Sequence, residues 1–486
     1  MSRVRWRVLA AVTAGLMVAS AALSGAADAS SAAPASGGIS GVKGDPQPEL
    51  KPFKIAGVGS GGANVAIESN GAMVVAYAVG TANADGKTVV CVLDRGASKC
   101  SSSVSLIPPG GATLEDTPVV FAPSPNHVVV VTGTCCVENP NDADLVYTST
   151  NGGRTFGAPV GVGETVAVTA AALIGGQIVF ASGGHDGAQV ESIPVSPGGP
   201  PATTATPIAA VSYNIGVGAY KGGALVASQF DGSSIDSTYV DYAQSGKNFN
   251  ANGSYHRVGN FPNEDLIGIS GDALLTEAAS GALKVRLFNG ASFGAAHVVP
   301  ALGHLGGPAW WAIDQDPRGQ VDVFSDRAFA PVSYDLYLQT TSTGASWTSP
   351  LNLGNAITSD YFGSALDSIG SGLAVGTTDH EPVWAYPVLA PQGVSFALAK
   401  STIGKGKSTV GSGKGSPVAK GRTVWLQQER SGKWWTVAST HESSTGAFSF
   451  TIGGSAAGTV DYRAVVSDFA GYLQYGYSAG RALKVS

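Results

Sequence analysis

Acidic and imidazole side chains recur directly after apolar, strand-like segments of this sequence. Carboxylates gathered on one surface can bind a cation or hold sugar hydroxyl groups, and a pair at a defined separation can hydrolyse a glycosidic bond. We therefore take these groups, with the Arg and Trp beside them, as candidate ligand-binding residues. They are Asp116, Glu138, His185, Asp186, Asp231, Asp265, Trp311, Asp326, Arg327, Asp379, His380 and Glu381.

A second interpretation of these acids stays open. An Asp at the end of a strand often caps a turn by accepting hydrogen bonds from its own backbone, which requires no ligand. Sequence also leaves the separation of two carboxylates undefined. The chain contains no G-x-S-x-G, H-E-x-x-H, EF-hand or phosphate-loop motif. We therefore assign no catalytic residue, no metal site and no cofactor.

Short β-strands must position these residues. Gly is unusually frequent (67 residues), charged residues make up only 13%, and long amphipathic helical windows are nearly absent, which is typical of an all-β protein with many turns. From about Pro52 to Pro391 a four-strand unit repeats roughly every 40 to 55 residues. The repeat is marked, at its third hairpin, by Cys100, Phe156, a site near Pro201, Phe249, Phe293 and Trp347.

Two of these hairpins carry a recognisable turn motif, S-x-[DN]-x-G-x-T-[WF]. An Asn or Asp at its third position can cap a tight turn, and the Gly supplies a positive φ. The first copy consists of Ser149, Asn151, Gly153, Thr155 and Phe156. The second copy, with Ser at the Asp position, consists of Thr340, Ser342, Gly344, Ser346 and Trp347.

This motif resembles the Asp-box of the BNR repeat, which occurs in sialidase-like β-propellers. The resemblance implies a propeller over residues 51–392 with the Asp-box turns on its outer rim. We expect seven blades, with six, the count in sialidases, as the alternative. The run 53–58 resembles a fourth strand, so we expect it to close the ring by pairing with 383–389. In a propeller the candidate acids would gather on one face around the channel.

The resemblance does not extend to sialidase catalysis, which requires an arginine triad, a Tyr–Glu pair and an Asp acid. The early F/Y-R-I-P signature is replaced by K-P-F-K-I at 51–55. Among the six propeller arginines, we place Arg95 and Arg154 in rim turns and Arg257 and Arg286 in strands. Only Arg318 and Arg327 remain as loop candidates, so we expect no hydrolysis of sialosides.

The N-terminus predicts secretion. Three arginines precede an apolar run from 8 to 23, and Ala27-Asp28-Ala29 offers a cleavage site, so residues 1–29 are interpreted as a signal peptide. An uncleaved membrane anchor is the alternative. Residues 30–50 are expected to be a flexible N-terminus. Removing 1–29 changes the formal charge from −6 to −8, which argues against nucleic-acid binding.

The four cysteines predict disulfides in an oxidising compartment. Cys91 and Cys100 flank a turn and are expected to pair across their hairpin, which leaves Cys135 and Cys136 as an adjacent pair. The alternative links Cys91 or Cys100 to Cys135 or Cys136 between neighbouring blades.

Residues 393–486 resemble the Ig-like modules at the C-termini of secreted actinobacterial proteins, and predict a β-sandwich. Residues 400–416 are either a linker or a first strand with a loose loop. Alternation predicts that one of Trp434 and Trp435 faces the core and the other is exposed. Together with Trp425 they suggest a carbohydrate platform, although a buried Trp is equally normal in a sandwich.

Taken together, the sequence favours a secreted, monomeric, non-catalytic protein that binds an extracellular glycan, cell-wall polymer or protein. The alternative is a glycan-degrading hydrolase or lyase that uses carboxylates on the propeller channel face.

Overall fold

A computed structural model describes residues 52–56, 62–81, 84–108, 117–132, 144–162, 168–184, 187–195, 206–209, 214–231, 236–249, 251, 253–300, 311–330, 333–356, 361–377, 382–468 and 472–486. These residues form strands and turns, and no helix occurs among them. Accordingly, no helix in the described ranges is long and apolar enough to cross a membrane.

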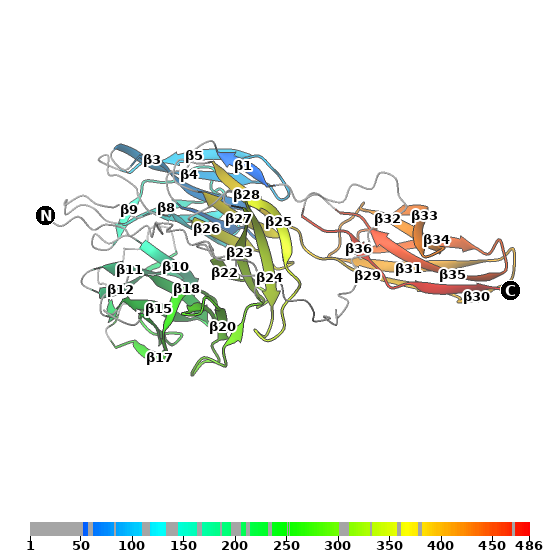
Figure 1. Cartoon of the computed structure of the whole chain (residues 1–486). Coiled ribbons are helices and arrows are strands. Elements are labelled where there is room, and N and C mark those ends of the chain that lie inside the picture. Colours follow the sequence, from blue (N-terminus) through cyan, green and yellow to red (C-terminus); the bar gives the residue numbers. More distant parts are fainter. Residues whose placement is uncertain are drawn as a thin grey trace. The chain divides into compact units, whose positions relative to one another are not determined.

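The described residues before position 390 form seven four-stranded antiparallel sheets, numbered here in chain order (Figure 1). Sheets 1 to 3 comprise β2 (Ala63–Ile67), β3 (Met73–Thr81), β4 (Ala84–Leu93), β5 (Ser102–Leu106); β6 (Val119–Ser124), β7 (His127–Thr132), β8 (Asp144–Ser149), β9 (Val160–Val162); and β10 (Val168–Ile174), β11 (Gln177–Gly184), β12 (Gly187–Pro194), β13 (Thr206–Ala209). Sheets 4 and 5 comprise β14 (Ile215–Tyr220), β15 (Gly223–Asp231), β16 (Asp236–Ala243), β17 (Tyr255–Pro262); and β18 (Glu264–Ser270), β19 (Ala273–Ala278), β20 (Leu283–Leu287), β21 (His297–Val298). Sheets 6 and 7 comprise β22 (Trp311–Gln315), β23 (Val321–Ala330), β24 (Ser333–Thr341), β25 (Leu351–Ala356); and β26 (Tyr361–Leu366), β27 (Gly372–Thr377), β28 (Val383–Val388) with β1 (Phe53–Ala56).

The sheets form a closed ring of propeller type. The first strands of consecutive sheets contact one another from β2 to β26, and β26 in turn contacts β2. The expected closure is confirmed, because β1 pairs antiparallel with β28, with Phe53 opposite Ala385 and Lys54 opposite Trp384 (Figure 1). The first and last strands of the ring therefore lie in one sheet, and β1 covers an edge that would otherwise be free to aggregate.

The core of the ring is divided among the seams between sheets. Seven clusters of buried apolar residues can be distinguished in the described residues, and each draws on two neighbouring sheets. In the seam between sheets 6 and 7, for example, Phe324 and Leu336 pack against Tyr386. This follows from the alternation of each strand, which sends successive side chains to opposite faces of its sheet.

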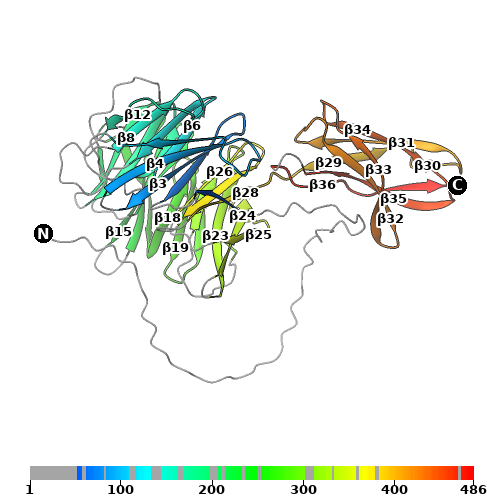
Figure 2. The ribbon, with the colours of Figure 1, turned by 90° about the horizontal axis from the view of Figure 1, so that it is seen from above.

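Residues from 393 onward form two further sheets, in orange to red in Figure 2. One sheet contains β29 (Gly393–Leu398), β31 (Ser408–Ser416) and β34 (Ala447–Gly453). The other contains β30 (Thr402–Ile403), β37 (Arg481–Val485), β35 (Gly458–Val466), β36 (Gly476–Tyr477), β32 (Thr423–Arg430) and β33 (Lys433–His441). Their facing side chains share one core, in which Phe396 and Phe450 meet Leu426. We call this pair of sheets the sandwich.

Residues 402–416 lie in β30 and β31 and the turn between them, so the linker alternative for 400–416 is wrong. Alternation in the sequence predicts sandwich strands at 423–428, 434–440, 447–452, 460–466 and 481–485, and each observed strand begins and ends within two residues of these bounds. The sequence predicts the fourth strand of sheet 2 at 156–162, but the strand begins at Val160 because the preceding residues build the turn.

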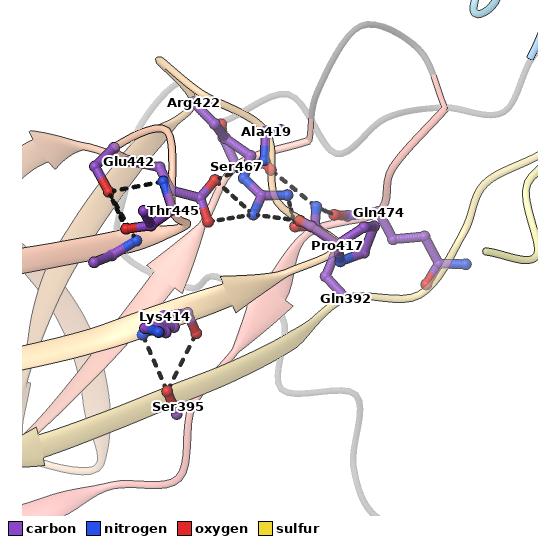
Figure 3. Close-up of polar contacts among 12 residues, drawn as sticks. Gln392, Ser395, Lys414, Pro417, Ala419, Arg422, Glu442, Thr445, Ser467 and Gln474 are labelled. Atoms are coloured by element: carbon purple, nitrogen blue, oxygen red, sulfur yellow. Dashed lines mark hydrogen bonds and ion pairs between the residues drawn. The ribbon is translucent and has the colours of Figure 1, made fainter. Parts of the chain in front are cut away.

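A buried ion pair fixes one end of the sandwich (Figure 3). Arg422 and Glu442 are both almost fully buried, and Arg422 Nη2 lies 2.8 Å from Glu442 Oε2. Arg422 also donates to Pro417 O and to the side chain of Gln392. Gln392 in turn donates to the backbone carbonyl of Ser467, so the network connects four segments of the module.

The disulfide prediction is confirmed for its first pair. Cys91 and Cys100 are bonded across their hairpin, with their Cα atoms 5.4 Å apart. Bonds from either residue to Cys135 or Cys136 between neighbouring blades are therefore wrong. Cys135 and Cys136 themselves lie outside the described residues. A disulfide fits an oxidising, extracellular compartment.

Candidate functional site

The turn after β8 is capped by side-chain oxygens of Ser149 and Asn151, and the cap by Asn151 is the one that the sequence predicts. Ser149 Oγ accepts from the backbone N–H of Gly153 at 2.9 Å, and Asn151 Oδ1 accepts from Thr155 N at 2.9 Å. Gly153 has a φ of 76°, and a Cβ atom there would lie 3.2 Å from Val92 of sheet 1. Glycine is therefore required both by the backbone and by the contact with the preceding sheet.

The second copy of the turn is built differently in detail. The oxygen that accepts from Gly344 N is Thr341 Oγ1, at 2.9 Å, rather than the side chain of Ser342 that the motif aligns with Asp. The expected equivalence of the aromatic residues is nevertheless confirmed. Phe156 packs in the seam between sheets 1 and 2, and Trp347 in the seam between sheets 5 and 6.

Most of the predicted ligand face falls on positions that the structure does not describe. These are Asp116, Glu138, His185, Asp186, Asp379, His380 and Glu381. For four others the backbone is described. Trp311 begins β22, while Asp231 ends β15 opposite Asp236, and Asp326 and Arg327 lie inside β23 opposite Leu336 and Asp335. The expected loop position of Asp326 and Arg327 is therefore wrong, because the hairpin of β23 and β24 extends to Ala330.

Asp265 is the one candidate whose side chain is described, and it is tied to the neighbouring sheet. Its Oδ1 accepts from Gln229 Nε2 of β15 at 3.0 Å. Gln229 Oε1 accepts in turn from Asn214 Nδ2 at 2.8 Å and from Leu266 N at 3.2 Å. This network joins sheets 4 and 5, which is the structural role that turn-capping and strand-pairing acids often have.

The adjacent acid, Glu264, neutralises a buried arginine. Its carboxylate accepts from Arg286 Nη1 at 2.6 Å, Lys284 Nζ at 2.7 Å and Thr276 Oγ1 at 2.6 Å. Burial alone would raise the pKa of Glu264, but the hydrogen bonds from Arg286, Lys284 and Thr276 outweigh it and hold the pKa at about 2. Arg286 lies over the ring of Phe261 in sheet 4, at 4.4 Å. As expected, Arg257 and Arg286 lie within strands, β17 and β20.

Sheet 6 contains two neighbouring carboxylates that were not among the candidates from the sequence. Asp314 and Asp322 lie directly opposite each other in β22 and β23, and Asp322 is fully buried with no hydrogen-bond partner on either oxygen. Burial, followed by the charges of Asp316 and Asp314, raises the pKa of Asp322 to about 8. The signal in the sequence was an acid inside the apolar run Val321-Asp322-Val323-Phe324. In the described ranges these acids do not converge into a metal-binding group.

The aromatic surface of the sandwich is the candidate site that the described residues do build. The outward side of the six-stranded sheet carries rings from three of its strands, β32, β33 and β36, and from the residue before β36. Trp425 stacks on Tyr475 with ring centroids 6.0 Å apart, and Trp434 and Tyr477 lie 4.4 and 5.0 Å from the guanidinium carbon of Arg463. We call Trp425, Trp434, Arg463, Tyr475 and Tyr477 the aromatic face.

Only part of this face is evident from the sequence. Trp434 lies on the outward side, whereas Trp435 lies opposite Gln428, whose other neighbour is the core residue Tyr462. Trp435 thus faces the core side, as alternation predicts for one of the two residues, but it is 43% exposed because it lies on the edge strand β33. Arg463 is not evident from the sequence because its contact with Trp434 crosses β32. The position of Trp434 relative to β32 depends on the register between β32 and β33, which shifts at a bulge at Leu426 and Gln427.

Comparisons with known proteins give no family assignment. No protein-family model and no curated protein sequence matches the chain. Among solved structures, a protein of unknown function from Dyadobacter fermentans is 12% identical, with 71% of this chain and 99% of that chain covered and a TM-score of 0.38. AofleA from Arthrobotrys oligospora is 11% identical, with coverages of 84% and 93% and a TM-score of 0.36.

A fungal lectin from Aleuria aurantia, described as a six-bladed β-propeller that recognises fucose, is 10% identical, with coverages of 81% and 98% and a TM-score of 0.35. Likenesses this weak carry no argument about this chain, so the fold described above rests on its own strand pairing.

Proposed function

We propose that this chain is a secreted, non-catalytic carbohydrate-binding protein, and that the aromatic face of the sandwich binds the carbohydrate. The carrying observation is the group of rings on one side of one sheet, with Tyr477 36% exposed and a guanidinium beside two of the rings. Aromatic rings offer large, rigid contact surfaces to the apolar C–H face of a sugar, and polar groups beside them fix its orientation.

In the fuller form of this proposal, residues 1–29 direct secretion and residues 51–392 form a seven-bladed Asp-box propeller. Residues 393–486 form an Ig-like module, and the mature protein is a monomer. The strand pairing of the seven sheets and the turn at Ser149 support this description.

A non-catalytic role is supported by three described acids of the ring that are engaged in ion pairs, and by the full burial of Asp322, an acid of the ring without a hydrogen-bond partner. Glu264 neutralises Arg286, Asp241 pairs with Arg257 at 2.8 Å, and Asp316 pairs with Arg318. Each of these carboxylates holds strands or turns of the ring together. A carboxylate engaged in this way is poorly placed to act as a general acid or as a nucleophile.

The test is a glycan array with the mature protein, followed by calorimetric titration of the best ligand. Trp434→Ala should weaken binding at least tenfold. Trp435→Ala is the matched control, since the neighbouring ring points to the other side of β33, and it should bind like the parent protein. Equal losses in both variants, or no glycan bound at all, would refute the proposal.

Incubation of the same ligands with product analysis tests the enzymatic alternative. We expect intact glycans, and intact fluorogenic sialoside, after prolonged incubation. Turnover of a glycan would favour the hydrolase or lyase, and sialoside turnover abolished by Arg327→Ala would show that the arginines were misplaced.

A further inference from the structure

The charge of this chain is divided unevenly between its two parts. Residues 51–392 contain 13 Lys and Arg against 27 Asp and Glu, so their formal charge is −14 with His counted as neutral. Residues 393–486 contain 11 Lys and Arg against four Asp and Glu, a formal charge of +7. The sandwich is therefore a basic module in an acidic protein, and a polyanion is attracted to this module while the rest of the chain repels it.

One end of the sandwich collects six exposed cations, and we call it the basic end. Arg430 and Lys433 lie opposite each other at the turn between β32 and β33. Because β32 pairs with β35 and β35 pairs with β37, this turn lies at the same end as Lys484 of β37. The segment between β29 and β31 reaches that end too, since β30 pairs with β37 there (Figure 1). The basic end consists of Lys400, Lys405, Lys407, Arg430, Lys433 and Lys484.

Backbone hydrogen bonds hold the turn between β30 and β31 in place. Lys405 N donates to Ser486 O at 2.7 Å, which connects the turn to the end of β37. Lys407 O accepts from Gly454 N at 2.8 Å, which connects it to the residue after β34. Cations from both sheets of the sandwich are therefore presented together on an ordered surface.

The cations of the basic end are not neutralised within the described chain. None of the six forms an ion pair there, and the ion pair of the sandwich is the buried one at its other end. Arg430 donates to a neutral acceptor, Gln428 Oε1, at 2.7 Å. The acids at this end are the half-buried Glu429 and Asp461 together with the carboxylate of Ser486, so positive charge remains in excess.

We propose that the basic end binds a flexible cell-surface polymer of polyol units joined by phosphodiesters. This surface is separate from the aromatic face, and the inference does not depend on the proposed function. Five of its six cations are lysines, which bind phosphate as point charges, whereas the planar fork of arginine is the group that favours a carboxylate. A repeating phosphodiester can neutralise several lysines with one chain, and each contact releases a counter-ion.

The arrangement of the basic end favours such a polymer over a nucleic-acid duplex or a membrane. The cations surround a compact end of two sheets rather than forming a stripe, so a flexible chain reaches more of them than a stiff duplex does. Membrane binding draws on exposed apolar side chains as well as charge. Those of the sandwich lie outside the turns of this end; they are Val410, Val418, Trp435, Val437 and Tyr477.

Fluorescence-anisotropy titration of the mature protein with labelled poly(glycerol phosphate) tests the proposal. Binding should weaken by about tenfold or more between about 50 and about 200 mM NaCl, because several phosphate contacts release counter-ions. Polyglycerol of the same length is the matched ligand without phosphate, and it should not bind.

Two double variants with equal charge locate the binding surface. Lys405→Gln with Lys407→Gln should weaken binding of the polymer by about tenfold at low salt, since two neighbouring contacts are lost. Lys414→Gln with Lys420→Gln is the matched control, because it removes the same charge from exposed lysines of the same module. Lys414 lies opposite Ser395 near the other end of the sandwich, so this variant should bind like the parent protein. All four side chains are exposed, and both variants should unfold in urea like the parent.

Absence of polymer binding by the parent protein would overturn the proposal. Equal losses in the two double variants would also overturn it, by showing that net charge rather than the basic end decides binding. Tighter binding of a DNA duplex, or of phosphatidylglycerol vesicles, than of the polymer would assign this end to nucleic acid or to a membrane instead.

Discussion

Cys100 occupies in sheet 1 the place that Phe156 occupies in sheet 2. Each lies seven residues beyond the last residue of the third strand, Leu93 or Ser149. In each hairpin the residue that follows Cys100 or Phe156 donates its backbone N–H to a carbonyl of the third strand. Ser101 N donates to Val92 O at 2.7 Å, and Gly157 N donates to Thr148 O at 3.0 Å. Both side chains pack in the seam with the preceding sheet. A disulfide thus stands where the described hairpins of sheets 2, 4, 5 and 6 place an aromatic ring.

This equivalence predicts that an aromatic residue can partly replace the disulfide. Cys91→Ala with Cys100→Ala should lose about 2 to 3 kcal/mol of unfolding free energy, the range expected for a short closed loop. Cys91→Ala with Cys100→Phe should lose less, because the ring fills the seam between sheets 7 and 1. Urea unfolding of the two double variants measures the difference. Lower stability for the Phe variant would contradict the equivalence.

Removal of the closing strand should expose β28 as a sheet edge. We expect a protein lacking residues 53–56 to form dimers and larger aggregates, because the unpaired backbone groups of β28 become available to another chain. Size-exclusion chromatography with light scattering is the measurement. A protein lacking residues 30–50 serves as the control and should stay monomeric. A monomeric 53–56 deletion with unchanged unfolding would show that the ring does not need closure.

Buried Asp322 predicts that the ring loses stability as the pH rises. Its pKa is raised to about 8 in the folded chain, so between its unfolded value of about 4 and about 8 the native state binds more protons than the unfolded state. The free energy of unfolding should therefore fall across this window. Asp322→Asn should reduce the fall by more than about 1.4 kcal/mol, the equivalent of one pKa unit.

Urea unfolding at pH 5 and pH 8 provides the comparison for Asp322. Asp94→Asn is the control, because the Asp94 carboxylate is exposed in a turn of sheet 1, and it should leave the pH dependence unchanged. If the parent protein and Asp322→Asn respond to pH alike, Asp322 is ionised in the folded chain and the prediction is wrong.

The Arg422–Glu442 pair should be costly to break but cheaper to replace. Glu442→Gln leaves a buried guanidinium without a counter-ion and should destabilise the sandwich by about 3 to 5 kcal/mol. Arg422→Met combined with Glu442→Leu removes both charges and should recover much of that loss. Denaturant unfolding followed by near-UV circular dichroism tests this order. A double variant less stable than Glu442→Gln would instead show that the hydrogen bonds to Pro417 O and Gln392 dominate.

The sequence predicted those parts of the fold that depend on local pattern. Alternation with turn residues at both ends predicts strands at Tyr361–Leu366, His127–Thr132 and Arg481–Val485, and these are the observed bounds. The closing strand was predicted because the run 53–58 resembles other fourth strands, and the observed strand is Phe53–Ala56. Strand ends in long hairpins were not predicted: β23 continues through Asp326 and Arg327 because β24 pairs with it, and that partner is not a local signal.

The candidate site was harder to predict for the same reason. A Trp in an alternating strand is visible in sequence, but the stacking of Arg463 on Trp434 depends on two strands that are not neighbours in the sheet. The burial of Asp322 likewise depends on the seam between sheets 6 and 7. The sequence shows only an acid within an apolar run. That this acid is buried becomes evident only when the neighbouring sheet is in place.

The closure of the ring by β1 also determines the order in which this chain can fold. Residues 53–56 leave the ribosome before the rest of the ring, but their partners 383–385 come almost at its end, so sheet 7 cannot be completed until nearly the whole ring has been synthesised. This contact has the longest loop to close and pays the largest closure entropy. The ring of such a chain therefore stays open until its synthesis is almost complete.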